Sequence, residues 1–145
     1  VSELCQVNIS DVDFNRKVVR ITGKGNKMRI TPIGDKSLEV LNKYLNTREN
    51  LDNNQPLFIN KSGRRIYPRL IHRIVAKYLS KVTDIEKKSP HILRHSAATH
   101  MLDNGADIRV VKEILGHENL STTQIYTRVS IERLKSAYKK SHPKS

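Results

Sequence analysis

The order of hydrophobic and polar positions along the chain predicts a mostly helical protein with one small sheet. In most of the chain, apolar side chains recur three and four positions apart, which is typical of helices that bury one face. The predicted helices cover residues 36–48, 68–81, 89–104, 107–116 and 130–140, with the end of a further helix at 1–8. Residues 16–33 instead alternate around the turn GKGN, which predicts a β-hairpin. We therefore expect an α+β fold, mostly helical with a small antiparallel β-sheet, in which residues 57–59 are a candidate further strand.

The helix predicted over residues 89–104 carries two different faces. Three apolar side chains spaced four apart are expected to face the core: Leu93, Ala97 and Met101. Residues three and four apart are neighbours on a helix, so the titratable residues share another face. That second face holds His91, Arg94, His95 and Ala98. Gly105 is expected to end this helix in the left-handed conformation, and the next helix is expected to end at Gly116.

Basic residues outnumber acidic ones, and the excess is concentrated in the second half of the chain. Lys and Arg total 27 against 14 Asp and Glu, a formal net charge of +13. Residues 1–60 hold 9 basic and 7 acidic groups, whereas residues 61–145 hold 18 and 7. This asymmetry indicates a polyanionic partner for the second half. A basic protein without a specific partner is the alternative at this point, because charge governs association rather than fold.

The composition excludes several other classes of protein. A single cysteine, Cys5, rules out an internal disulfide and any Cys-rich zinc site. The sequence has no apolar run long enough to span a bilayer and no signal peptide, so we expect a cytoplasmic protein with no membrane partner. The chain opens on VSELCQV rather than on Met, which we interpret as a cut end.

Four residues of the second half are candidates for chemistry: His91, Arg94, His117 and Tyr126. His91 and Arg94 lie near a predicted helix N-terminus, where free N–H groups favour an anion, and the arginine fork matches phosphate oxygens. The Tyr126 hydroxyl, with an ordinary pKa of about 10, is a weak nucleophile unless a base or cations assist it. Taken singly, each residue also has an ordinary structural interpretation. His91 and His95 have the spacing of a zinc pair, but Arg94 would repel a cation there, so we expect no metal site.

In combination, these residues resemble the signature of a known family. The segment SPHILRHSAATHMLDNGADIRVVKEILGHENLSTTQIYTRVSIERL is similar to the carboxy-terminal catalytic core of the tyrosine recombinases, or phage integrase family, and above all to its Xer-like members. The signature is His-x-x-Arg at His91 and Arg94, Leu-Gly-His ending at His117, and a tyrosine nine residues later at Tyr126. The hairpin GKGNKMR also resembles the family's hairpin, whose lysine would be Lys24.

The resemblance implies strand exchange in double-stranded DNA without a metal, a nucleotide or another cofactor. Tyr126 would attack a backbone phosphate and leave a 3′-phosphotyrosyl link and a free 5′-hydroxyl. Arg94 and His117 would hold the phosphate oxygens, since fixed cations are the main requirement of phosphoryl transfer. Lys24 would protonate the leaving 5′-oxygen, and His91 would accept the tyrosine proton or hold the phosphate.

DNA contacts are expected from basic residues on the hairpin and on the helix over 68–81. The candidates are Lys27, Arg29, Arg69, Arg73 and Lys77. Those on the helix are equally compatible with a solvated face. By resemblance, the C-terminal helix would dock onto a neighbouring protomer of a tetramer on DNA, through Leu134 and Tyr138. Packing of that helix on its own domain is the alternative.

Two features leave related functions open. The family's further catalytic arginine, in the pattern Arg-x-Ser-Glu-Leu, would stand just before Val1, and the amino-terminal DNA-clamping domain is expected to lie outside residues 1–145. We therefore expect this chain to be a catalytic domain truncated at its N-terminus. The alternatives are a type IB topoisomerase, which relaxes DNA by the same chemistry, and a non-catalytic DNA-binding fragment.

Overall fold

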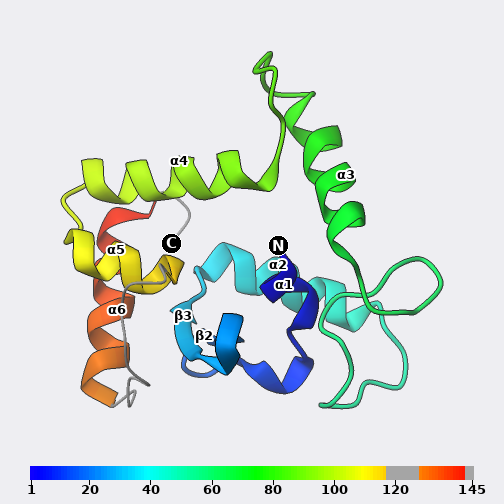
Figure 1. Cartoon of the computed structure of the whole chain (residues 1–145). Helices are drawn as coiled ribbons and strands as arrows, with labels where there is room; N and C mark the ends of the chain where they lie inside the picture. The colour runs from blue at the N-terminus through cyan, green and yellow to red at the C-terminus, as the bar shows by residue number, and fades with distance from the viewer. Residues whose placement is uncertain (117–127, 143–145) are drawn as a thin grey trace.

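The computed structural model describes residues 1–116 and 128–142, and at Lys24, Arg128 and Val129 it describes only the backbone. Figure 1 shows how the elements within these residues are arranged. The helices are α1 (Ser2–Gln6), α2 (Asp35–Asn46), α3 (Pro68–Leu79), α4 (Pro90–Asp103), α5 (Ile108–Leu115) and α6 (Arg128–Ser141). The strands are β1 (Val12–Asp13), β2 (Val18–Thr22) and β3 (Met28–Pro32). None of the helices in this described part of the chain is long and apolar enough to cross a membrane.

The three strands form one antiparallel sheet in the order β1-β2-β3. The predicted hairpin is confirmed, because β2 pairs with β3 from Thr22 opposite Met28 to Val18 opposite Pro32. Its turn contains a short 3-10 segment in which Gly25 has a φ of 72°, a left-handed conformation that glycine adopts without steric cost. The prediction of a further strand at residues 57–59 is wrong. This part of the chain makes only isolated bridges, at Pro56 and Ile59, because it runs as a loop past other loop residues.

The predicted helices are present with shifted ends. Asp107 caps α5, since its side chain accepts a hydrogen bond from the Arg109 backbone N–H at 2.7 Å. Gly105 follows α4 with a φ of 82°, so the predicted left-handed stop is confirmed. The predicted end of α5 at Gly116 is also confirmed, and this glycine is left-handed as well, with a φ of 68°. Residues 117–127, which include Tyr126, lie outside the described residues.

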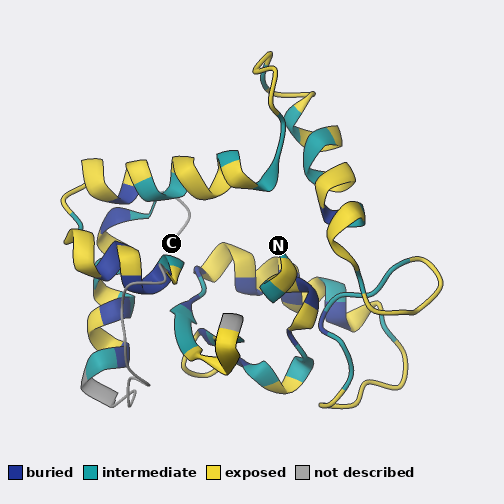
Figure 2. Ribbon diagram, in the orientation of Figure 1, coloured by how far each residue is buried: buried dark blue, intermediate teal, exposed yellow. Residues whose placement is uncertain are grey.

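Buried apolar residues gather in two clusters, which Figure 2 shows in dark blue. The first lies around the sheet and α2 and contains Val7, Val12, Leu41, Leu45 and Leu57. The second lies among α4, α5 and α6 and contains Met101, Val110, Val111, Ile114 and Leu134. Strand β3 contacts both α5 and α6, so it joins the helical part to the rest of the domain.

Helix α4 is anchored only by its C-terminal half, which corrects the predicted apolar face. Met101 is 2% exposed, whereas Leu93, expected in the core, is 47% exposed. Ala98, expected on the titratable face, packs against the second cluster instead. The physical reason is that α5 and α6 contact α4 near its C-terminal end, while its N-terminal half extends past them toward α3 (Figure 1).

Helix α6 packs on its own domain. This was the alternative to the expectation that the C-terminal helix docks onto a neighbouring protomer. Leu134, expected as an anchor on a neighbouring protomer, is fully buried in the second cluster. Arg133 of α6 pairs with Glu113 of α5 at 3.1 Å, and the Asn104 side chain donates a hydrogen bond to the Ser141 carbonyl at 3.1 Å. Tyr138 is half-buried and its ring stacks on His142 with 4.4 Å between ring centroids.

Replacing the buried anchor of α6 should destabilise the isolated chain. Leu134→Ala should lower the free energy of unfolding by about 2–5 kcal/mol, because it leaves a cavity in the second cluster. The matched control is Leu102→Ala at a side chain that is 40% exposed, where we expect a loss of about 1 kcal/mol or less. Urea titrations of the two variants measure the difference, and equal losses would contradict the burial of Leu134 against its own domain.

The two helix-ending glycines should differ in their tolerance of alanine. Both have positive φ, so alanine costs a similar backbone strain of about 1–2 kcal/mol at each. A Cβ on Gly105 would meet nothing within 4 Å, whereas one on Gly116 would lie 2.5 Å from Cζ of Arg29. Gly116→Ala should therefore lower the thermal midpoint more than Gly105→Ala. Equal shifts would show that the Arg29 side chain moves away freely.

Candidate active site

The N-terminal half of α4 presents two of the predicted catalytic residues to solvent. His91 and Arg94 are three positions apart, so they lie on the same side of the helix, and both are exposed. Pro90 occupies the first turn and Ser89 precedes it without a side-chain capping bond. A helix N-terminus with an adjacent arginine favours an anion such as a phosphate.

Arg94 lies within electrostatic range of Glu3 on α1. The pKa of the Glu3 carboxyl is below its ordinary value, first because Arg29 donates hydrogen bonds to it. Burial acts in the opposite direction, and the positive charges of Arg29 and Arg94 lower the pKa further. Figure 1 shows the start of the chain lying across from the N-terminal half of α4. The fold therefore places α1 across from the N-terminal half of α4, although some ninety residues separate Glu3 and Arg94 in sequence.

Arg29 on β3 links α1 to the end of α5. Its guanidinium donates to both Glu3 carboxylate oxygens, Nη1 to Oε1 at 2.6 Å and Nη2 to Oε2 at 2.9 Å. Its Nε donates a longer hydrogen bond to the Ile114 carbonyl at 3.4 Å. The Arg29 side chain is 14% exposed and that of Glu3 is 31% exposed. Arg29 was predicted to contact DNA, but its guanidinium faces these protein groups rather than solvent.

The other predicted catalytic residues are described only in part. Lys24 begins the 3-10 turn Lys24–Asn26 between β2 and β3, at the tip of the hairpin. His117 directly follows Gly116 in the sequence, but His117 and Tyr126 both lie outside the described residues. The structure thus joins Glu3, Arg29 and the end of α5, with Arg94 in electrostatic range of Glu3. The convergence of the five catalytic candidates stays a prediction.

The predicted DNA-contacting residues other than Arg29 are exposed. They are Lys27, Arg69, Arg73 and Lys77. Of the ion pairs formed within residues 1–116 and 128–142, none involves these four side chains. Their charges are therefore available to a polyanion, and their contacts with DNA stay a prediction.

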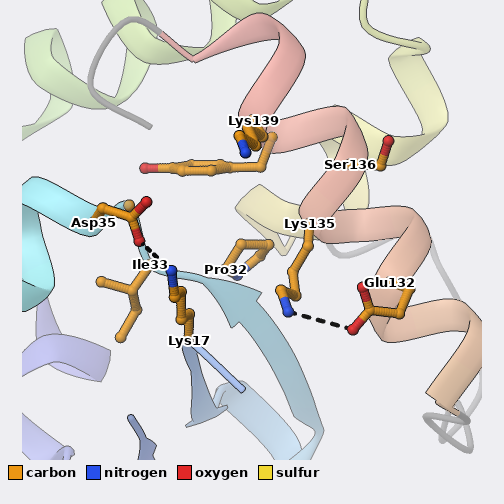
Figure 3. Close-up of a pocket in the computed structure, with 10 residues that line it drawn as sticks. Lys17, Pro32, Ile33, Asp35, Glu132, Lys135, Ser136 and Lys139 are labelled. Atoms are coloured by element: carbon orange, nitrogen blue, oxygen red, sulfur yellow. Dashed lines mark hydrogen bonds and ion pairs between the residues drawn. The ribbon is translucent and has the colours of Figure 1, made fainter. Parts of the chain in front are cut away.

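No metal cluster accompanies His91 in the described part of the chain. No group of three or more His, Cys, Asp or Glu side chains gathers there, so His91 and His95 have no third ligand among these residues. A cavity of about 390 Å³ lies beside α6 (Figure 3). Lys17 and Asp35 form an ion pair of 2.6 Å in the wall of this cavity. No predicted catalytic residue lines the cavity.

Sequence reasoning missed the pair formed by Glu3 and Arg29. Glu3 belongs to the stretch VSEL that matches part of the family pattern, and this was the one signal in the sequence that could have singled it out. Nothing in the spacing of Glu3 and Arg29 predicts their contact, because α1 and β3 meet only in the folded chain.

Comparisons with known proteins agree with this arrangement. The model of the Phage integrase family matches residues 1–133. A tyrosine recombinase XerC of Corynebacterium glutamicum is 47% identical over 146 residues, which cover 100% of this chain and 47% of that protein. The chain thus spans about half the length of the curated relatives it matches.

Solved structures share the fold. XerA recombinase has a TM-score of 0.72 and 37% identity, covering 99% of this chain and 53% of that chain. A post-cleavage complex of the XerH site-specific recombinase, bound to a palindromic difH substrate, has a TM-score of 0.70 and 31% identity, covering 94% of this chain and 40% of that chain. By the extent of the family match and by these likenesses, the chain belongs to the phage integrase family, that of the tyrosine recombinases.

Proposed function

We propose that this chain is the catalytic domain of a site-specific DNA recombinase that uses Tyr126 as its nucleophile. The observation that carries the proposal is the family match over residues 1–133, which includes all five catalytic candidates in order. These candidates are Lys24, His91, Arg94, His117 and Tyr126. Similarity to XerC proteins along the whole chain and to the DNA-bound XerH recombinase supports the same activity.

The proposed reaction exchanges one phosphodiester for another of similar energy. The Tyr126 oxygen forms a bond to the DNA phosphorus, and the bond from phosphorus to the 5′-oxygen breaks. The tyrosine proton passes to His91 or to solvent, and Lys24 gives a proton to the leaving 5′-oxygen. A 5′-hydroxyl of the partner strand then attacks the 3′-phosphotyrosine and releases Tyr126. Because a phosphoester is conserved at each step, the reaction needs no nucleotide.

The charges around Glu3 suit this role for Arg94. The Glu3 carboxylate already receives both outer donors of Arg29, so its charge is neutralised inside the protein. Arg94 is exposed, and none of the hydrogen bonds or ion pairs among the described residues involves its side chain. Its guanidinium is therefore free to bind two oxygens of a phosphate and to stabilise the charge of the transition state.

DNA affinity in this proposal comes mainly from phosphate contacts along α3. Arg69, Arg73 and Lys77 are exposed there and have no carboxylate partner among the described residues. Contacts of this kind release counterions from the DNA, so binding weakens steeply as salt increases. A location in the cytoplasm, where chromosomal DNA is accessible, goes with this proposal.

Assembly into a tetramer on DNA through α6 would require this helix to leave its own domain and pack into the domain of a neighbouring protomer. In this structure Leu134 of α6 fills the core of its own domain, so it has no surface left for a neighbour. Docking onto another protomer would insert the same side chain into the equivalent site of that protomer, an exchange of identical elements between copies. The proposal for the tetramer therefore includes release of α6 from its own domain.

The nucleophile is tested by trapping the covalent intermediate. With the protein at its full natural length and a nicked suicide DNA substrate, Tyr126→Phe should form no covalent adduct while DNA binding is retained, because the attacking oxygen is missing. Tyr67→Phe, at a 44% exposed tyrosine, is the matched control and should form adducts at the normal rate. Adducts formed by Tyr126→Phe would refute the assignment, and relaxation of plasmid lacking a specific site would favour a topoisomerase.

The DNA-facing role of α3 is tested by the salt dependence of binding. Arg73→Gln and Lys77→Gln should each reduce the slope of log affinity against log salt by about 1, since each removes one phosphate contact. Lys36→Gln on α2 is the control at an exposed lysine, and its slope should equal that of the unchanged protein. Fluorescence anisotropy with duplex DNA over a range of salt concentrations measures these slopes. Unchanged slopes in both α3 variants would mean that this face is merely solvated.

A further inference from the structure

Three segments that are distant in sequence meet at the guanidinium of Arg29. The segments are α1 through Glu3, β3 through Arg29 itself, and the end of α5 through Ile114 and Gly116. The Ile114 carbonyl accepts hydrogen bonds from Arg29 Nε and from Thr31 Oγ1, each at 3.4 Å. Gly116 lies so close to the guanidinium that an added Cβ would meet Arg29 Nε at 2.7 Å and Nη1 at 2.8 Å.

Electrostatics favours this arrangement at the C-terminal end of α5. The last carbonyls of a helix have no intrahelical partner and carry the negative end of the helix dipole, so a cation beside them is stabilising. The Arg29 side chain is only 14% exposed, and the Glu3 carboxylate supplies the counter-charge that such a buried cation needs. Arg29 can therefore stay beside the end of α5 only when the Glu3 carboxylate binds its guanidinium and balances its charge.

We propose that Arg29, fixed by Glu3, is a positioning residue for the strand-cleavage reaction. It sets the place and direction in which the chain leaves α5 at Gly116, and the segment that follows begins with His117. This inference rests on the proposed function, since it matters for chemistry only if His117 binds the reacting phosphate. Arg29 does not touch the DNA in this proposal and acts through the backbone of α5.

The geometry requires a guanidinium rather than any positive charge. Arg29 uses Nη1 and Nη2 for the two Glu3 oxygens and Nε for the Ile114 carbonyl at the same time. A lysine ammonium is a single point charge and does not reproduce this planar fork. Arg29→Lys should therefore behave like Arg29→Gln.

The neighbouring strand supplies a matched control. Arg20 on β2 also donates two hydrogen bonds to one carboxylate, that of Asp11, both at 3.1 Å. Its side chain is 52% exposed, and within the described residues neither Arg20 nor Asp11 bonds to α5. Arg20→Gln thus removes an equivalent ion pair from the same sheet without touching the end of α5.

The experiment is a double-mutant cycle between Arg29 and His117. Single-turnover cleavage of a suicide DNA duplex is measured at saturating DNA with the protein at its full natural length. The variants are Arg29→Gln, Arg29→Lys, His117→Ala, the double variant Arg29→Gln/His117→Ala and Arg20→Gln. Thermal unfolding and DNA affinity are measured in parallel, so that loss of folding or of binding is separated from loss of cleavage.

We expect Arg29→Gln and Arg29→Lys to slow cleavage about 10–100-fold, while DNA affinity stays nearly unchanged. A loss of about 10–100-fold is typical when a residue that orients a functional group is replaced. In the His117→Ala background, Arg29→Gln should slow cleavage by less than about threefold, because the residue it positions is already missing. Arg20→Gln should cleave like the unchanged protein.

Two different failures are distinguishable. If Arg29→Gln slows cleavage equally with and without His117, or if Arg29→Lys restores it, the positioning role is wrong while the recombinase assignment stands. If His117→Ala cleaves at the full rate, the proposed function of this site fails, and the inference fails with it. Should Arg29→Gln not fold, the same cycle with Arg29→Lys decides the question.

Discussion

The ion pair between Glu3 and Arg29 links three segments of the fold that are distant in sequence. It joins α1 to β3, and through the Ile114 carbonyl it reaches the end of α5. The two buried clusters of the domain are separate, and β3 lies where they meet. A largely buried arginine is tolerable at this junction because a carboxylate and a helix C-terminus share its charge. Besides packing, the Thr31 hydroxyl also links β3 to α5 through the same Ile114 carbonyl.

The two arginines that act on Glu3 differ in their surroundings. Arg29 is bonded within the protein, whereas Arg94, whose charge also acts on Glu3, is exposed, and its side chain bonds to no side chain or backbone group among the described residues. A site that binds a DNA phosphate needs both kinds, because a fixed framework must hold the cations that meet the substrate. The net charge of +13 therefore says little by itself about which residues face DNA.

Helix α4 combines a half anchored against α5 and α6 with an exposed half that carries two of the proposed catalytic residues. Met101, near its C-terminal end, is buried among α5 and α6, while His91 and Arg94, near its N-terminal end, are exposed. A duplex is too large to enter a closed pocket, so cations that act on its backbone must stand on an open surface. Leu93 in this half is 47% exposed, because α5 and α6 contact α4 near its C-terminal end.

The sequence by itself determined the local elements and the order of the catalytic candidates. The hairpin around GKGN, the left-handed stop at Gly105, the helix end at Gly116 and the helices between them follow from local propensities, which act over a few residues. Tertiary structure alone decided that Leu134 is buried in its own domain and that Arg29 pairs with Glu3. Both outcomes depend on contacts between distant segments, and a periodic pattern shows that a side chain is apolar or charged without showing which surface it meets.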